Sequence, residues 1–272
     1  MSTSPTTESI AADLAFAKMA AQTAGDRILA LVAQERWEGK MLADVGDQAA
    51  DGYLQGLFAG RYPDDGILSE ETKDSEERLA KHRCWIIDPL DGTREFSQLR
   101  HDWAVHVGLT FGGECGLAAV ALPNQKRMMW AVTAPGHEAY GMDGDGEMLR
   151  GDSTGPATPR VACSRSHTPD WVENFVTGIG GEKAPAGSVG NKVSMLLLGN
   201  ADVYVHKIGL KEWDTCAPEV IARALGWSVC KLRGDEHRYN QRDPYNNELV
   251  ICRPAMKAQV LEVLAGCGAL ED

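Results

Sequence analysis

The segment Trp85-Ile86-Ile87-Asp88-Pro89-Leu90-Asp91-Gly92-Thr93 places two carboxylates directly after a run of apolar residues. Because Pro89 fixes φ and has no N–H to donate, the run is expected to be a buried strand that ends in a turn. Gly92 permits a tight approach, and with Thr93 it is expected to open a helix whose amides can bind phosphate. Carboxylate oxygens are the ligands that Mg²⁺ prefers. The segment therefore indicates metal-assisted hydrolysis of a phosphate ester.

Other acidic residues can complete such a site from distant parts of the chain. Mg²⁺ prefers about six oxygen ligands, and two cations about 3.5–4 Å apart can hold the attacking and leaving oxygens of a displacement. Glu70, from the pair Glu70-Glu71, and Asp214 are the candidates to join Asp88 and Asp91. The open alternative is that residues 88–93 form only a well-capped turn. The acidic residues upstream and downstream favour the metal site.

Thr93 has a second expected role, because a hydroxyl beside a metal can orient the attacking water when a carboxylate accepts its proton. Asp47 is the candidate partner. Its alternative role is that of N-cap for the helix expected over 47–58, and both roles can hold together. Asp47 and Thr93 are therefore predicted as the catalytic pair.

The overall composition excludes several classes of protein. With 272 residues, of which 43% are apolar and 24% charged, the chain is expected to be globular. Its formal charge of 27 − 39 = −12 argues against binding nucleic acid or an anionic membrane. Residues 1–10 lack the features of a secretory signal, and no apolar stretch approaches the ~18–20 residues of a membrane span. A cytoplasmic location is therefore expected.

The seven cysteines are scattered and odd in number, and none forms a Cys-x-x-Cys pair. This pattern argues against a disulfide framework and against a structural zinc site. The cysteines are expected to be small buried residues in a reducing compartment.

Hydrophobic periodicity predicts the order of helices and strands. Helices are expected over 7–34, 47–58 and 214–225, after Pro169, near Lys192 and from Ala255 onward. Strands are expected over 67–69, 84–87, 103–109, 117–121, 128–132, 203–205 and 249–252. The consecutive strands before residue 132 indicate an antiparallel sheet covered by the preceding helices. The Gly- and Asp-rich stretch 143–160 is the expected boundary between an α+β domain over 1–150 and an α/β domain over 151–272.

Three segments resemble the signatures of the inositol monophosphatase superfamily, in the family's order and spacing. They are Leu68-Ser69-Glu70-Glu71, Asp88-Pro89-Leu90-Asp91-Gly92-Thr93 and Trp213-Asp214-Thr215-Cys216-Ala217-Pro218. The resemblance covers nearly the whole chain. It implies the layered α-β-α-β-α sandwich of that family and a Mg²⁺-dependent phosphatase activity.

Further residues resemble one branch of that superfamily. Thr93-Arg94-Glu95-Phe96 is similar to the continuation found in 3′(2′),5′-bisphosphate nucleotidases (the CysQ branch), and segments 100–106 and 238–245 resemble its actinobacterial members. The implied substrate is 3′-phosphoadenosine 5′-phosphate. Loss of its 3′-phosphate would give AMP, as a recycling step of sulfur assimilation.

The resemblance also implies roles for individual residues. The implied metal ligands are Glu70, Asp88, the carbonyl of Leu90, Asp91 and Asp214, with Asp47 and Thr93 activating water. The implied substrate contacts are Gly92, Thr93, Ser164, Ser188 and Lys192, within segments 164–167 and 187–192. Two or three Mg²⁺ ions are implied. Mn²⁺ can substitute and Li⁺ can inhibit in such enzymes, and a homodimer is common among them.

Several of these residues have alternative roles. Lys192 is equally explained as a solvated surface lysine, and His106 as a neutral histidine packed in the core. Asp102 is expected to cap a turn or hold Arg100, and residues 238–240 to shape the substrate mouth or form a structural loop.

The whole chain also has alternative functions. One is an inositol monophosphatase or broad sugar phosphatase, and another is a non-catalytic sensor that binds nucleotide or metal. The continuation Arg94-Glu95-Phe96 favours a nucleotide substrate, and the complete set of site carboxylates favours an enzyme over a sensor.

Overall fold

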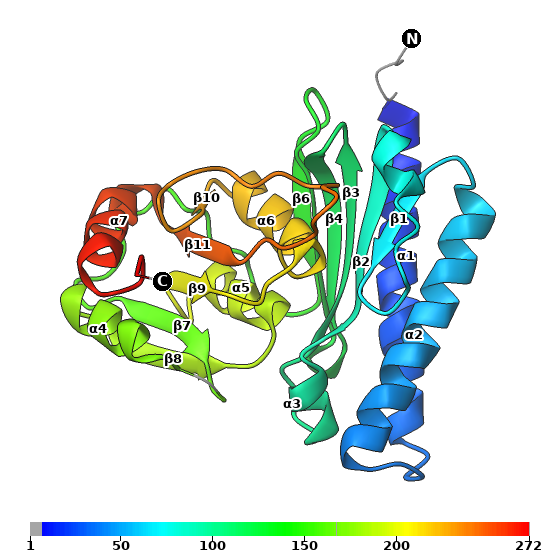
Figure 1. Cartoon of the computed structure of the whole chain (residues 1–272), viewed down its shortest axis with the longest axis horizontal. Coiled ribbons are helices and arrows are strands. Elements are labelled where there is room, and N and C mark those ends of the chain that lie inside the picture. Colours follow the sequence, from blue (N-terminus) through cyan, green and yellow to red (C-terminus); the bar gives the residue numbers. More distant parts are fainter. Residues whose placement is uncertain (1–6, 167, 272) are drawn as a thin grey trace.

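The computed structural model describes residues 7–166 and 168–271 of the chain. Figure 1 shows five layers: a pair of helices, a sheet, a second pair of helices, a second sheet and a third pair of helices. The predicted α-β-α-β-α sandwich is therefore confirmed.

The first helical layer consists of α1 (Thr7–Val32) and α2 (Gly39–Arg61). Half of the buried positions of α1 are alanines, whose small side chains let the helix lie close to its neighbours. A Cβ atom on Gly25 would lie only 2.4 Å from the Pro123 side chain, so this close approach requires glycine. The helix predicted over 7–34 is confirmed.

The second helix begins at Gly39, about two turns before the predicted start at Asp47. Asp47 therefore lies inside the helix, and its expected role as N-cap is wrong. The first turns of α2, which the sequence does not predict, have Gly39 at one end and Gly46 at the other. Because glycine is a weak helix former, these residues give little helical signal. A Cβ atom on Gly46 would lie 2.8 Å from the ring of Phe96, which fixes α2 closely against the segment after the aspartates.

The larger sheet contains six strands in chain order: β1 (Gly66–Ser69), β2 (Arg83–Asp91), β3 (Ala104–Phe111), β4 (Glu114–Leu122), β5 (Arg127–Val132) and β6 (Ala139–Asp143). β1 and β2 are parallel, and all later neighbours are antiparallel. The predicted antiparallel sheet is thus confirmed from β2 onward. β6 is not among the predicted strands, because its exposed and half-buried residues give little hydrophobic signal.

Strand β2 continues past Pro89, where the sequence predicts its end, to Asp91. Residues three apart in a regular strand point to opposite faces of the sheet. Here the register against β3 shifts between Asp88 and Asp91, an irregularity that tolerates a proline and redirects side chains. The shift lets both carboxylates turn toward the same place.

The smaller sheet has the strand order β10-β11-β9-β7-β8. Its strands are β7 (Arg160–Ser164), β8 (Glu182–Ala186), β9 (Val203–Lys207), β10 (Ser228–Cys230) and β11 (Glu248–Cys252). Helices α5 (Val189–Leu197) and α6 (Glu212–Ala224) lie between the two sheets, and α4 (Asp170–Gly178) and α7 (Lys257–Gly266) cover the far side (Figure 1). The helices and strands predicted after residue 160 are confirmed, whereas β7, β8 and β10 are short and were not predicted.

One apolar cluster joins the middle helices to both sheets. It includes Val120 of β4, Val193 of α5, Ile221 of α6 and Leu249 of β11. Within the described residues no helix or strand lies between β6 and β7, at the predicted boundary. Because a shared core crosses that boundary, the division into domains over 1–150 and 151–272 stays a prediction.

The expectation that the cysteines are unpaired is wrong for Cys115 and Cys216, which form a disulfide between β4 and α6. Cys84, Cys163, Cys230, Cys252 and Cys267 are free and buried. The pair is 101 residues apart in the sequence, and its members meet only because α6 packs across β4. Such a long-range contact leaves no spacing pattern in the sequence.

Loss of this disulfide should destabilise the protein, because the unfolded chain then gains conformational entropy. Cys115→Ser is expected to lower the free energy of unfolding by about 2–5 kcal/mol, as for other long loops. Urea denaturation without reductant measures the change. Cys84→Ser, at a free buried cysteine, is the control. If Cys115→Ser costs as much with dithiothreitol as without it, the disulfide does not contribute.

Candidate active site

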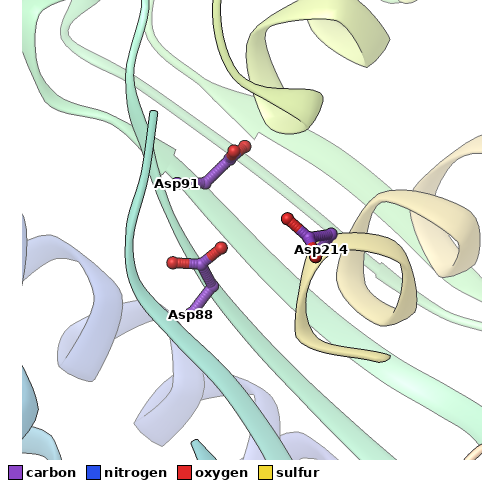
Figure 2. Close-up of side chains that lie close together, drawn as sticks. All are labelled: Asp88, Asp91 and Asp214. Atoms are coloured by element: carbon purple, nitrogen blue, oxygen red, sulfur yellow. The ribbon is translucent and has the colours of Figure 1, made fainter. Parts of the chain in front are cut away.

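Three aspartates from two distant parts of the chain lie together. Asp88 and Asp91 come from β2, and Asp214 comes from the first turn of α6 (Figure 2). One carboxylate oxygen of each lies within 4.8 Å of the other two. Asp88 and Asp91 are buried, and Asp214 is half-buried. The structure thus brings together three of the residues predicted as metal ligands.

Backbone groups fix the direction of these carboxylates. Oδ1 of Asp88 accepts the N–H of Leu90 at 3.0 Å, and Oδ2 of Asp214 accepts the N–H of Lys211 at 2.7 Å. After Asp91 the chain turns at Gly92, whose φ of +94° favours glycine, into the short helix α3 (Thr93–Ser97).

Asp91 is held by two groups to which the sequence analysis gave no such role. Its Oδ2 accepts the N–H of Gly190 at 2.7 Å and lies 3.1 Å from Nε2 of His106. Burial alone would lower the pKa of His106, but the charge of Asp91, together with the contacts of the ring with Asp91 and the Trp213 carbonyl, raises it. Burial likewise favours protonation of Asp91, and the charge and hydrogen bond of His106 reverse this and lower the pKa of Asp91.

His106 is fully buried, as the core alternative predicts, and its Nε2 also lies 3.1 Å from Oδ2 of Asp91. That the ring is neutral stays a prediction. Its Nδ1 lies 3.2 Å from the carbonyl oxygen of Trp213. One sequence signal could have revealed the contact. His106 is directly opposite Asp88 in the ladder between β2 and β3, so aligning these two strands would have placed the imidazole beside the carboxylates.

The remaining acidic groups are crowded. Burial, followed by the charge of Asp91, raises the pKa of Asp214 to about 7. The Glu70 residue as a whole is exposed, yet loss of water around its carboxyl and the charges of Glu71 and Asp91 raise its pKa to about 7. Burial and the charges of Glu70 and Asp91 raise the pKa of Asp88 well above its ordinary value.

This donor set fits a divalent cation. Oδ2 of Asp88 is buried and accepts no hydrogen bond from any described residue, so one strong oxygen ligand is free to bind an ion. The neighbouring carboxylates of Glu70, Asp91 and Asp214 are hard oxygen donors of the kind that Mg²⁺ prefers. A bound cation would also relieve the repulsion among the carboxylates.

The two residues of the predicted catalytic pair have different neighbours. Burial and the charges of Glu71 and Glu70 raise the pKa of Asp47 to about 8, so Asp47 lies near the acidic pair. The hydroxyl of Thr93 donates to the carbonyl oxygen of Leu90 at 3.2 Å. No hydrogen bond between Asp47 and Thr93 occurs in the part of the chain that the structure describes, and their joint role stays a prediction.

Two of the predicted substrate residues lie at the start of α5, beside Asp91 and Gly92. Oγ of Ser188 accepts the N–H of Asn191 at 2.9 Å and caps the helix. Lys192 is only 5% exposed, and its Nζ donates to the carbonyl oxygen of Ser188 at 3.0 Å. The alternative of a solvated surface lysine is therefore wrong.

Glycine is needed at two positions around Asp91. A Cβ atom on Gly92 would lie 3.0 Å from Cβ of Ser188, and one on Gly190 would lie 2.4 Å from Nε2 of His106. The start of α5 therefore packs directly against the aspartate segment.

Ser164, the remaining predicted substrate residue, lies at the end of β7. Its hydroxyl is 3.5 Å from that of Ser166, and among the described residues it makes no hydrogen bond to the three aspartates. His167, in the same predicted segment, lies outside the described residues.

Asp102 holds a different partner from the one predicted. Its Oδ2 accepts Nη2 of Arg165 at 2.6 Å and the N–H of Gly187 at 2.7 Å, whereas Arg100 donates to Gln98. Asp102 thus connects the start of β3 to segments that follow β7 and β8. The expected pairing with Arg100 is wrong because the true partners are far away in the sequence.

Hydrogen bonds to Glu212 and Arg78 hold the segment 238–241 in place. The carboxylate of Glu212 accepts the N–H of Asn240 at 2.6 Å and that of Gln241 at 2.7 Å. Arg78 donates to Oδ1 of Asn240 at 2.8 Å. These contacts favour the structural-loop alternative for this segment.

The crowded carboxylates predict an unusual effect of pH on the metal-free protein. Glu70 and Asp214, with pKa values of about 7, and Asp47, with a pKa of about 8, ionise near pH 4 once the chain unfolds. The folded state therefore binds more protons than the unfolded chain, and its free energy of unfolding should fall between about pH 6.5 and about pH 8. Mg²⁺ should raise the melting temperature more at the higher pH.

The melting temperature, measured at about pH 6.5 and about pH 8 with either EDTA or Mg²⁺, tests this effect. The window begins at about pH 6.5 because His206, whose pKa burial lowers to about 4, contributes the opposite slope below that pH. Asp214→Asn should reduce the pH dependence. A melting temperature of the metal-free protein that rises across the window would contradict the expectation.

Comparisons with known proteins agree with this site. The chain matches the inositol monophosphatase family over residues 7–268. A 3′-phosphoadenosine 5′-phosphate phosphatase of Mycobacterium leprae (strain TN) is 36% identical over 267 residues, covering 93% of this chain and 92% of that protein. The phosphatase of the same name from Mycobacterium tuberculosis (strain CDC 1551 / Oshkosh) is 35% identical over 233 residues, covering 83% and 81%.

Solved structures share the fold. Inositol monophosphatase II of Staphylococcus aureus MSSA476 has a TM-score of 0.79 at 20% identity, covering 94% of this chain and 96% of that one. CysQ from Bacteroides thetaiotaomicron has a TM-score of 0.75 at 24% identity, covering 89% and 97%. With a family match over nearly the whole chain and relatives above 30% identity, the chain belongs to the inositol monophosphatase family.

Proposed function

We propose that this chain is a Mg²⁺-dependent phosphatase that removes the 3′-phosphate of 3′-phosphoadenosine 5′-phosphate to give AMP and phosphate. The observation that carries the phosphatase chemistry is the cluster of Asp88, Asp91 and Asp214, in which one buried acceptor oxygen has no hydrogen-bond partner among the described residues. The substrate is supported by the mycobacterial phosphatases, which match over most of the chain.

The proposed metal ligands are Glu70, Asp88, Asp91, Asp214 and the carbonyl of Leu90, for two or three ions. Bound Mg²⁺ would supply Lewis-acid chemistry, by lowering the pKa of water and offsetting charge on the phosphoryl oxygens. Mn²⁺ is proposed to substitute and Li⁺ to inhibit.

Thr93 and Asp47 are proposed to position the attacking water. Because the Thr93 hydroxyl donates its proton to Leu90, its lone pairs are free to accept a hydrogen bond from water. The carboxylate of Asp47 would accept the second proton of that water. The water oxygen then forms a bond to phosphorus and the bond between phosphorus and the 3′ oxygen breaks. That oxygen leaves as a hydroxyl after taking a proton from solvent water, and Asp47 returns the proton it accepted to solvent.

The phosphate is proposed to lie against the amides of Gly92 and Thr93, beside Ser188 and Lys192. Lys192 is a buried cation near Asp91, which supports a role in attracting an anionic substrate to a protein whose net charge is −12. Ser164 is proposed to contact the rest of the nucleotide. A homodimer and a recycling step of sulfur assimilation complete the proposal, and these two rest on the family resemblance. A cytoplasmic location is also proposed.

A substrate panel tests the proposal directly. Mg²⁺-dependent phosphate release is compared for 3′-phosphoadenosine 5′-phosphate, inositol 1-phosphate, fructose 1,6-bisphosphate and AMP. We expect kcat/KM to favour the first by at least about tenfold, or about 1.4 kcal/mol of transition-state free energy. A higher kcat/KM for inositol 1-phosphate would show that the substrate is wrong, and no release from any compound would favour a non-catalytic sensor.

Removal of one central carboxylate charge should stop turnover. Asp91→Asn is expected to reduce kcat by more than about a hundredfold, since loss even of a group that only supports a metal ligand typically costs 10–100-fold. Asp26→Asn, at an exposed position of α1, is the matched control and should not change kcat. Circular dichroism checks that both variants fold. Full activity of Asp91→Asn would show that Asp91 is not a metal ligand.

A further inference from the structure

The segment that carries the acidic pair Glu70-Glu71 is held from outside by a single carboxylate. Oδ1 of Asp51 accepts the hydroxyl of Ser69 at 2.6 Å, and Oδ2 accepts the hydroxyl of Thr72 at 2.6 Å. The two hydroxyls flank the acidic pair on either side in the sequence. Asp51 thus uses both of its oxygens to hold the two ends of a segment of four residues.

The sheet already holds the first end of this segment, because Ser69 is the last residue of β1 and pairs with Ile87 of β2. Little else fixes the residues after it, since residues 71–73 make no backbone–backbone hydrogen bond among those found in the described chain. Glu71 and Thr72 are exposed, so apolar packing does not order them either. The hydroxyl bonds to Asp51 are charge-assisted, and such bonds are about twice as strong as neutral ones.

Asp51 itself is a firm anchor. It is 8% exposed and lies one helical turn after Asp47, so both project from the same face of α2. The close contact of Gly46 with Phe96 holds this part of α2 against the segment that follows Asp91. The helix therefore connects the acidic pair to the aspartates through rigid structure.

We propose that Asp51 is a positioning residue that holds Glu70 in place for the metal site through the hydroxyls of Ser69 and Thr72. This inference rests on the proposed function, because it takes Glu70 to be a metal ligand. Asp51 does not touch the metal or the substrate. Its role is to lower the cost of ordering Glu70, so that less of the binding free energy is lost when the ion binds.

Variants separate the hydrogen bonds from the charge of Asp51. Asp51→Ala removes both bonds and the charge. Asp51→Asn removes the charge but keeps one acceptor and one donor, with which both hydroxyls can still bond. Ser69→Ala combined with Thr72→Val removes both bonds and leaves the charge. Asp44→Ala is the control for charge alone, because Asp44 lies on the same helix but bonds to Lys40.

The dissociation constant for Mg²⁺, measured by titration calorimetry without substrate, is the main readout. We expect Asp51→Ala and the Ser69→Ala/Thr72→Val double variant each to weaken Mg²⁺ binding by at least about tenfold. Asp51→Asn and Asp44→Ala should change it by less than about threefold. Adding Asp51→Ala to the double variant should cause no further loss, because the three residues act as one unit.

A second readout excludes a general loss of structure. At saturating Mg²⁺, kcat of both hydrogen-bond variants should return to within about threefold of wild type. A high concentration of Mg²⁺ fills the site even when its affinity is reduced. Wild-type Mg²⁺ affinity in both variants would overturn the positioning role while leaving the proposed function intact. If wild-type protein binds Mg²⁺ no better than Asp91→Asn, the metal site itself is wrong and both proposals fall.

Discussion

Repulsion among buried carboxylates is the constraint around which this structure is organised. Asp88, Asp91 and Asp214 are too close to carry three charges unless other groups stabilise them. The protein supplies the backbone N–H groups of Leu90, Lys211 and Gly190, and the ring of His106. These donors come from β2, β3 and the two helices that lie between the sheets. The layered arrangement is therefore what allows the acidic cluster to exist.

The middle helices explain why both halves of the chain are needed. α6 provides Asp214 and α5 provides Gly190, yet both helices are packed against strands of the larger sheet through a shared apolar cluster. The site is consequently fixed by burial of apolar surface on two sides, and does not depend on a flexible contact between separate bodies. His106 adds a polar contact within that interface, since it joins Asp91 to the backbone before Asp214.

Much of this site could be predicted because its main signals are local. The aspartates around Pro89, the acidic pair and the start of α6 are each short segments with a characteristic order, and three of the predicted carboxylates do lie together. The partners of Asp102 and Cys115 could not be predicted, because they lie far away in the sequence and meet only through strand order and helix packing. The early start of α2 could not be predicted because Gly39 and Gly46 lower the helix propensity of its first turns. Tertiary contacts such as that of Gly46 with Phe96 stabilise the helix there in the folded protein.

The two glycines beside Asp91 limit how such an enzyme can change. Gly92 faces Ser188 and Gly190 faces His106, and at each place even a methyl group would collide with its neighbour. Random mutagenesis aimed at a new substrate will therefore recover few functional variants at these positions. Side chains at and just after the end of β7, such as Ser164 and Ser166, are less tightly enclosed and can accept more substitutions. Substitutions that alter substrate preference are therefore expected at such positions rather than directly beside the aspartates.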